Sequence, residues 1–311
     1  MNTRVAYGVL LDYFELTKPR IIVLLLITTL AAMIMATRGI PPLGLVLVTL
    51  IGGAFAAGSA GALNCVIDRD IDRLMRRTAS RPLAVGRIAP APALVFAATL
   101  GILGFAILYR WANPLAAWLS LAGNVYYVLV YTLWLKRTTP LNIVIGGAAG
   151  AVPPLVGWAA VTHTIGAPAL GLFALIFLWT PPHFWALALM TETDYARANI
   201  PMLPNVRGVE HTKVQIFIYT LVLVAVSLAL TPLGVMGLWY FVPAAILGAI
   251  FIIDAWRIFG EPTAPPDAAS VAPGMDANTV RPTPPARVLF NYSLLYLALM
   301  CAAMVLDRIL G

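Results

Sequence analysis

Long apolar segments alternate with short polar segments along nearly the whole chain. A helix needs about 20 mostly apolar residues to cross the hydrocarbon core of a bilayer. Backbone polar groups in lipid must also be satisfied within the protein, which a helix achieves by itself. The pattern therefore predicts an all-α polytopic membrane protein with about nine transmembrane helices. The apolar segments lie near residues 20–37, 43–63, 91–109, 114–135, 141–162, 168–190, 214–232, 237–256 and 289–307.

Composition agrees with this interpretation. The 311 residues are 61% hydrophobic and 11% charged, whereas soluble domains have about 45–50% apolar and about 25% charged residues. We expect a single membrane-embedded domain over residues 1–311, with a Pro- and Ala-rich segment at 259–287 that is typical of a flexible cytoplasmic loop. Cys65 and Cys301 form no CxxC pattern, which argues against a disulfide framework or covalent haem attachment.

The basic residues predict an orientation. If the N-terminus is cytoplasmic, 17 of the 20 Lys and Arg residues fall on cytoplasmic segments, and only Arg38, Arg110 and Arg308 fall outside. Because Lys and Arg concentrate in cytoplasmic loops, this distribution favours a cytoplasmic N-terminus. The net charge of +7 then reflects topology in a lipid bilayer, and we expect no nucleic-acid partner.

Acidic residues cluster at the predicted cytoplasmic ends of two spans. In the stretch NCVIDRDIDRLMRR (64–77), Asn64, Asp68 and Asp72 are spaced four apart and would share one helix face, with Asp70 pointing away. Aspartates paired with arginines at a solvated helix end would explain such a stretch. However, acidic residues contribute little to topology, and a second pair, Glu192 and Asp194, follows another span on the same predicted side.

This arrangement suits a diphosphate bound through magnesium. Mg²⁺ prefers octahedral oxygen ligation and bridges one or two carboxylates to substrate phosphates. Guanidinium groups can bind the remaining phosphate oxygens in a bidentate manner. Because the chain has no Gly-rich P-loop, a phosphorylated lipid fits better than a nucleotide.

The N-x3-D-x3-D spacing from Asn64 to Asp72 resembles the first aspartate-rich motif of the UbiA superfamily of intramembrane prenyltransferases. Longer stretches resemble the haem-farnesylating branch of that superfamily, and the resemblance covers nearly the whole chain. Two positions depart from the superfamily pattern: Cys65 replaces an acid after Asn64, and Ala198 replaces a second aspartate after Asp194. The stretches that carry the branch resemblance are residues 68–83, 135–158, 179–189 and 194–204.

The resemblance implies a UbiA-type prenyltransferase bundle in the plasma (inner) membrane with a cytoplasmic active site. It also implies a reaction in which farnesyl diphosphate ionises with the help of Mg²⁺ and its allylic carbon alkylates a vinyl group of protohaem IX. Water then completes the side chain of haem O, and diphosphate is released. Haem O, or haem A made from it, serves terminal oxidases, so haem A synthase or terminal oxidase assembly are the partners that the resemblance suggests.

Roles for individual residues follow from the resemblance and from position. It implies catalytic roles for Asn64, Asp68, Asp72 and Asp194, the three aspartates being the metal ligands. Lys136 and Arg137 are equally consistent with a topological anchor. The groups placed to bind the diphosphate are Arg76, Arg77, Arg81, Lys136, Arg137 and Asn142.

His183 lies in the string TPPHFW, behind two prolines that are expected to kink the helix. Ionisable residues within a membrane are functional candidates. Two interpretations stay open: a contact to the iron or a propionate of haem, or a hydrogen bond to backbone freed by the kink. Aromatic faces that could shield a carbocation, or could merely pack, are those of Tyr126, Tyr127, Tyr131 and Trp134.

Two other functions compete with haem farnesylation. The first is a UbiA-type enzyme that prenylates an aromatic acceptor of a quinone or chlorophyll pathway, against which the strings TPPHFWALAL and IPMLP speak. The second is a transporter or an oxidase-assembly factor. Transporter sites usually lie near the bilayer midplane, whereas the acidic residues here cluster at one predicted face.

Overall fold

The computed structural model describes residues 3–260 and 284–311, and all regular elements in this part of the chain are helices. This confirms the predicted all-α class. The elements are α1 (Thr3–Leu16), α2 (Pro19–Thr37), α3 (Leu43–Ile67), α4 (Arg69–Asp72), α5 (Pro90–Ile107), η1 (Leu108–Ala112), α6 (Pro114–Val125), η2 (Tyr126–Leu135), α7 (Lys136–Thr138), α8 (Asn142–Thr162), α9 (Ala167–Met190), α10 (Glu192–Arg197), α11 (Leu203–Arg207), α12 (Val209–Ala229), α13 (Leu238–Arg257), η3 (Ile258–Gly260) and α14 (Pro284–Leu310).

The predicted number of spans is confirmed. Within the described residues, nine helical stretches are long and apolar enough to cross a membrane. Some boundaries differ from the prediction: α3 continues to Ile67, α12 begins at Val209 rather than near residue 214, and α14 begins at Pro284 rather than near residue 289. The turn added to α12, VEHTK, is mostly polar, so apolar length underestimated that helix. The cytoplasmic N-terminus stays a prediction, and most of the predicted loop at 259–287 lies outside the described residues.

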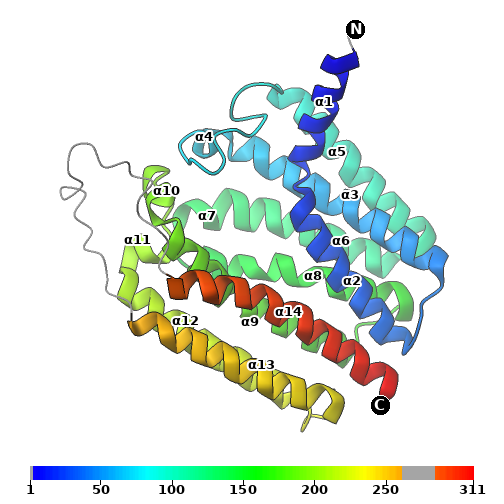
Figure 1. The fold of residues 1–311 in the computed structure, drawn as a ribbon. Coiled ribbons are helices and arrows are strands. Elements are labelled where there is room, and N and C mark those ends of the chain that lie inside the picture. Colours follow the sequence, from blue (N-terminus) through cyan, green and yellow to red (C-terminus); the bar gives the residue numbers. More distant parts are fainter. Residues whose placement is uncertain (1–2, 261–283) are drawn as a thin grey trace.

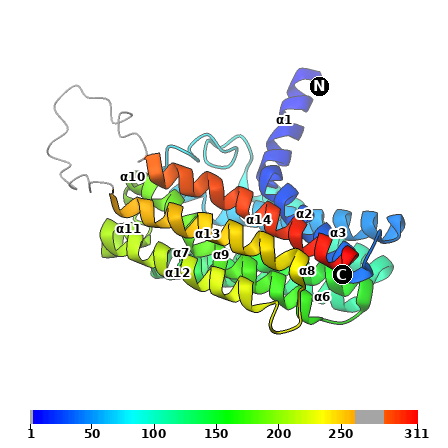
Figure 2. The same ribbon diagram turned by 60° about the horizontal axis from the view of Figure 1, so that its bottom comes forward.

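The long helices lie side by side in one bundle (Figure 1). The short helices α4, α10 and α11 gather at one end of it, although α4 and α10 are far apart in sequence. Figure 2 shows the same bundle turned, with α1 projecting away from the other helices. The short elements that carry both acidic clusters therefore share one end of the molecule.

Small residues allow the long helices to approach closely. A Cβ atom on Gly104 of α5 would lie 2.8 Å from the backbone nitrogen of Ala56 in α3, so that contact requires glycine. In α8, a Cβ atom on Gly147 would meet the side chain of Thr180 in α9 at 3.0 Å. These contacts hold α3 and α8, which lead into or out of the charged end, at fixed positions.

Proline pairs lie inside α8 and α9 without ending either helix. Pro181 and Pro182 fall within α9, which runs without interruption from Ala167 to Met190. In α8, the carbonyl of Pro153 accepts a hydrogen bond of 3.3 Å from the Thr29 hydroxyl of α2. This hydrogen bond joins α2 to the proline pair of α8.

Candidate active site

The first acidic cluster lies where α3 ends. Asp68 leaves the helical conformation and separates α3 from the short helix α4. The four-residue hydrogen-bond spacing nevertheless continues, because the Asp68 N–H donates to Asn64 and the Asp72 N–H donates to Asp68, at 2.9 and 2.8 Å. Asn64, Asp68 and Asp72 are consequently buried on one side, whereas the Asp70 side chain is 60% exposed. The predicted division of this stretch into two faces is confirmed.

A cation pairs with each carboxylate of the buried face: one comes from α7, and the other comes from the loop that follows α4. The Lys136 ammonium lies 2.5 Å from Asp68 Oδ2. The Arg81 guanidinium donates to both oxygens of Asp72, at 2.9 and 2.8 Å. A buried carboxylate without such a partner would be strongly destabilising, so these pairs explain how the face is maintained inside the protein.

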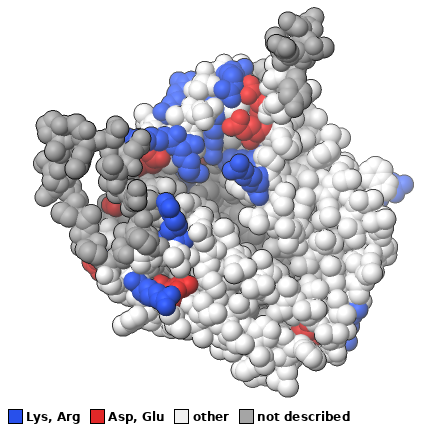
Figure 3. All heavy atoms as spheres, in the orientation of Figure 1, with Lys and Arg blue, Asp and Glu red and all other residues white. Residues whose placement is uncertain are grey.

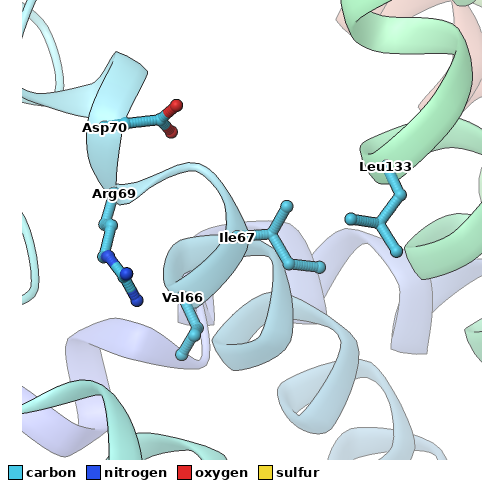
Figure 4. Close-up of a pocket in the computed structure, with 5 residues that line it drawn as sticks. All are labelled: Val66, Ile67, Arg69, Asp70 and Leu133. Carbon is cyan, nitrogen blue, oxygen red and sulfur yellow. The ribbon is translucent and has the colours of Figure 1, made fainter.

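Arg137 binds mainly the exposed side of the stretch and makes only a longer contact, of 3.7 Å, with Asp68. Its guanidinium donates two hydrogen bonds of 2.8 Å to Asp70, and this pair holds the pKa of Asp70 at about 2. A predicted pairing of Asp70 with arginine is therefore confirmed. Asp70 and Arg69 instead line a surface depression of about 420 Å³ between α3 and η2, together with Val66, Ile67 and Leu133 (Figure 4). Figure 4 shows Ile67 and Leu133 on facing sides of it, with the Asp70 carboxylate extending toward the side on which Leu133 lies.

Lys18 belongs to the site but was not predicted as a site residue. It stands between α1 and α2 in a left-handed conformation, with φ 60°. Its ammonium donates a hydrogen bond to the Asn64 side-chain oxygen, while the Asn64 amide donates to Asp68 at 2.8 Å and to the Thr132 hydroxyl at 3.0 Å. Burial lowers the pKa of Lys18. The sequence analysis counted Lys18 only among the topological cations.

The backbone of η2 positions the residues that face the first cluster. Tyr126–Leu135 is π-helical, with the Lys136 N–H donating to the Tyr131 carbonyl five residues earlier. The Thr132 hydroxyl donates to the Tyr127 carbonyl at 2.9 Å and accepts from Asn64. Wide turns of this type occur mostly at functional sites. Here the widened stretch leads directly into Lys136.

The aromatic candidates divide into two groups. Tyr127 and Tyr131 are partly buried and lie 5.4 Å apart between ring centroids, on the stretch that carries Thr132. Trp134 is 61% exposed, which favours the second of the two alternatives left open for it, a residue outside the site. The Tyr126 hydroxyl donates to the Ile145 carbonyl of α8 at 2.9 Å and so connects two helices.

The second acidic cluster contributes one buried carboxylate. Asp194 is 8% exposed, and its Oδ2 accepts a hydrogen bond of 3.3 Å from the backbone N–H of Arg77, in the loop after α4. The Arg197 guanidinium lies 3.8 Å from Asp194 Oδ1. Glu192 is only partly buried, and that burial raises its pKa. The two clusters therefore meet through Asp194 and the backbone of Arg77.

An apolar cluster holds the two acidic stretches together. Ile71 and Met75 of the first stretch pack with Tyr195 and Ala198 of the second. Ala198, which stands where the superfamily pattern has a second aspartate, is 6% exposed in this cluster. Burial also raises the pKa of Tyr195, whose hydroxyl is hydrogen-bonded by Arg77. The missing aspartate is thus replaced by packing that aligns α10 with α4.

The remaining predicted ligands lie at the edge of the buried face. Arg76 and Arg77 are exposed in the loop that follows α4. Asn142, at the start of α8, is fully buried, and its amide donates to the Thr139 carbonyl at 2.7 Å. Its side-chain oxygen is buried without a partner in the described part of the chain. Asn142 therefore stabilises its own turn and keeps one free acceptor.

The donor set suits a magnesium ion that arrives with phosphate oxygens. No group of three His, Cys, Asp or Glu side chains among the described residues is arranged to hold a metal by itself. Asp68 Oδ1 is buried without a hydrogen bond, with Arg137 3.7 Å away. A buried carboxylate oxygen without a hydrogen bond fits a hard cation that takes its other ligands from a substrate. The space-filling view shows Lys, Arg, Asp and Glu gathered at this end, above a nearly uncharged face (Figure 3).

Buried carboxylates surrounded by cations at one end of a nine-span bundle define a membrane enzyme site suited to a diphosphate. Residues 25–280 match the model of the UbiA prenyltransferase family, and the chain belongs to that family. It is 54% identical over 299 residues to the protoheme IX farnesyltransferase of Gloeobacter violaceus, covering 96% of this chain and 92% of the relative. It is 51% identical over 299 residues to the protein of that name from Synechocystis, covering 96% and 89%.

Solved structures show the same fold at low identity. A digeranylgeranylglyceryl phosphate synthase structure aligns with a TM-score of 0.76 at 18% identity, covering 97% of this chain and 99% of the other. A UbiA homologue from Archaeoglobus fulgidus, bound to DMAPP and Mg²⁺, aligns with a TM-score of 0.64 at 18% identity, covering 94% and 99%. The predicted UbiA-type bundle is thereby confirmed, and the chain is a multi-pass membrane prenyltransferase.

Proposed function

We propose that this prenyltransferase transfers the farnesyl group of farnesyl diphosphate to a vinyl group of protohaem IX, with addition of water, giving haem O and diphosphate. The observation that carries the proposal is the sequence comparison: about half of the aligned residues, over nearly the full length of the chain, are identical to those of proteins named protoheme IX farnesyltransferase. The buried, cation-paired carboxylates supply a site for the diphosphate part of the first substrate.

The site residues would act first on the diphosphate. Asp68, Asp72 and Asp194 would hold Mg²⁺, which neutralises the negative charge that develops on the leaving group. In the free protein, Lys136 and Arg81 donate to Asp68 and Asp72, and Lys18 donates to Asn64. When a diphosphate binds, they would turn toward its oxygens. Because hydrogen-bond donors that are in place beforehand need little reorganisation, they stabilise developing charge effectively.

The bond changes follow from the two substrates. The allylic C–O bond breaks and its electron pair leaves with diphosphate. The vinyl π electrons of the haem then form the new C–C bond at the allylic carbon. The cation left next to the porphyrin takes up water, which loses a proton to give the hydroxyl group. The apolar cluster of Ile71, Met75 and Tyr195 would limit access of water to the allylic cation before transfer.

The location of the reaction is part of the proposal. An active site at the cytoplasmic face of the inner membrane follows from the predicted positive-inside orientation. Haem A synthase or terminal oxidase assembly would receive the product. The Mg²⁺ dependence is supported by the homologue whose structure holds Mg²⁺ with DMAPP.

The experiment is a product assay with the purified full-length protein in detergent. Protohaem IX, farnesyl diphosphate and Mg²⁺ are supplied, and haems are extracted for mass spectrometry. We expect protohaem that has gained one farnesyl group and one water, only when Mg²⁺ is present. A parallel reaction contains 4-hydroxybenzoate as acceptor. A prenylated benzoate with unchanged protohaem would overturn the proposal in favour of an aromatic acceptor.

A further inference from the structure

The imidazole of His183 is held between aromatic rings at the interface of α9 and α14. Its ring centroid lies 4.2 Å from that of Trp179 and 4.7 Å from that of Phe290, with interplanar angles of 17° and 21°. The Trp179 indole N–H in turn donates to the Ser293 carbonyl at 2.7 Å. This stacking restricts rotation of the imidazole, so its two nitrogen atoms have fixed directions.

The hydroxyl of Ser293 determines which imidazole nitrogen carries the proton. Ser293 Oγ lies 2.6 Å from the Phe290 carbonyl oxygen and 2.7 Å from His183 Nδ1. A hydroxyl has one proton, and a carbonyl can only accept, so the Ser293 proton is directed to Phe290. His183 Nδ1 must then be the donor in its contact with Ser293. Because a neutral imidazole has one N–H group, Nε2 carries the unshared electron pair.

Nε2 has no hydrogen-bond partner in the described part of the chain. Unlike the unpaired side-chain atoms that are fully buried there, Nε2 keeps some exposed surface. It therefore reaches open space, consistent with the 8% exposure of the residue. His183 precedes Thr191, at the end of α9, by about 12 Å along the helix axis at the usual rise per residue. His183 thus lies within α9, about two helical turns before its charged end.

These contacts decide between the interpretations left open by the sequence. The partner of His183 is a hydroxyl of α14, so a hydrogen bond to backbone freed by the prolines was wrong. A neutral imidazole whose one N–H group faces Ser293 cannot donate from Nε2 to a haem propionate. An electron-pair acceptor fits this nitrogen. We propose that His183 Nε2 is an axial ligand of the iron in the haem substrate and that Ser293 is the positioning residue that fixes its tautomer.

This inference rests on the proposed function, since it assigns the acceptor substrate a ligand. The His183–Ser293 pair resembles the arrangement of many metal-bound histidines, in which the second ring nitrogen donates to an oxygen that fixes the orientation of the ring. Removing such an orienting partner typically weakens metal affinity about 10- to 100-fold.

The test uses absorption and electron paramagnetic resonance spectra of the purified full-length protein titrated with ferric protoporphyrin IX, without farnesyl diphosphate. We expect a histidine-ligated spectrum in the wild type and its loss in His183→Ala. The chain has three histidines, and the exposed His163 and His211 supply matched controls. His163→Asn suits the left-handed conformation of that position, φ 59°, and His211→Ala changes an exposed helix position. Both should keep the wild-type spectrum, and an unchanged spectrum in His183→Ala would overturn the ligand assignment.

Further variants separate ligation from packing. His183→Gly should regain a nitrogen-ligated spectrum when imidazole is added, which also shows that the variant is folded. Ser293→Ala should weaken ferric protoporphyrin binding about 10- to 100-fold while leaving binding of metal-free protoporphyrin IX unchanged. If Ser293→Ala weakens both porphyrins equally, its role is packing and the positioning assignment is wrong.

The product assay keeps the two proposals distinguishable. If the wild type binds haem through His183 but forms no farnesylated product, the proposed function fails and the ligand assignment stands. If the wild type forms product while His183→Ala keeps the wild-type haem spectrum, the ligand assignment alone fails.

Discussion

The two acidic clusters share one end of the bundle but are built differently. In the first cluster, Asp68 and Asp72 have side chains that are 0% and 3% exposed, and each is paired with a cation at 2.5–2.9 Å. In the second, Asp194 has an 11% exposed side chain, a backbone hydrogen bond of 3.3 Å and a guanidinium at 3.8 Å. The first cluster is thus tightly compensated, and the second is loosely held.

The difference indicates that the two clusters have different roles in binding the metal ion and diphosphate. Charged groups that are paired before substrate binds are already oriented, so the first cluster can receive a metal ion and diphosphate with little rearrangement. Asp194 lies in short helix α10, and only weak contacts restrain its carboxylate. It can therefore adjust to the metal from the opposite side. Substitutions should accordingly have graded effects on activity.

The largest effect is expected at the first cluster. Asp68→Asn removes the charge that would hold Mg²⁺ and leaves Lys136 without its carboxylate, so turnover should fall by about 10³-fold. The measurement is the rate of farnesylated haem formation by the purified protein. Asp70→Asn is the matched control, because it lies two residues away on the exposed face, and it should retain most activity. Equal losses in both variants would remove the distinction between the two faces.

Asp194→Asn should have the next largest effect, a loss of about 10²-fold in kcat/KM. It removes the one buried carboxylate of the second cluster, while the paired groups of the first cluster remain. Glu192→Gln, at a less buried position of the same helix, is the control and should stay close to wild type. If Asp194→Asn matched wild type, the second cluster would have no part in binding the metal or diphosphate.

Variants of Lys136 and Arg137 compare two neighbouring cations, one paired with the buried face of the first cluster and one paired with its exposed face. Lys136→Gln leaves Asp68 buried without its closest partner and removes a donor for diphosphate, so activity should fall by about 30-fold or more. Arg137→Gln removes a partner of the exposed Asp70 and should change activity by about threefold or less. Steady-state kinetics with varied farnesyl diphosphate would measure both. A larger loss in Arg137→Gln would reverse the assignment of the two faces.

Ala198→Asp would restore the aspartate of the superfamily pattern. Because Ala198 is buried in the apolar cluster with Ile71 and Met75, a carboxylate there should destabilise the protein by about 1–3 kcal/mol without raising activity. Thermal unfolding in detergent measures the first effect, with Ala198→Ser as a smaller polar control. Higher activity at unchanged stability would show that the pocket accepts a second acidic ligand.

The smallest effect concerns Asp70, whose pKa is held at about 2 by Arg137. A lowered carboxyl pKa contributes stability that is present above the usual pKa of about 4 and is lost as pH falls toward 2. Because the pair is exposed, the contribution should be below about 1 kcal/mol. The difference in unfolding temperature between wild type and Asp70→Asn should be constant above pH 5 and disappear near pH 2. A difference that grows on acidification would contradict this pairing.

Much of the site could be predicted because its pattern is local. The spacing of Asn64, Asp68 and Asp72 was sufficient to place them on one face, and it held although the helix breaks at Asp68. Lys18 was missed because its contact joins residues 46 apart, and nothing near residue 18 indicates that partner. The role of Trp134 stayed open in the sequence because an aromatic residue in an apolar helix has the same pattern whether it faces lipid or the interior.

The sequence by itself determined the nine spans, the two-faced acidic stretch and the family, since apolar length, helical spacing and motif identity depend on neighbouring residues. Only the tertiary structure decided which cation compensates which carboxylate, as in the contact of Lys136 with Asp68 across 68 residues. It likewise decided that Ser293 sets the tautomer of His183 across 110 residues. Buried polar groups must find partners wherever packing brings them, and that packing is a property of the assembled bundle.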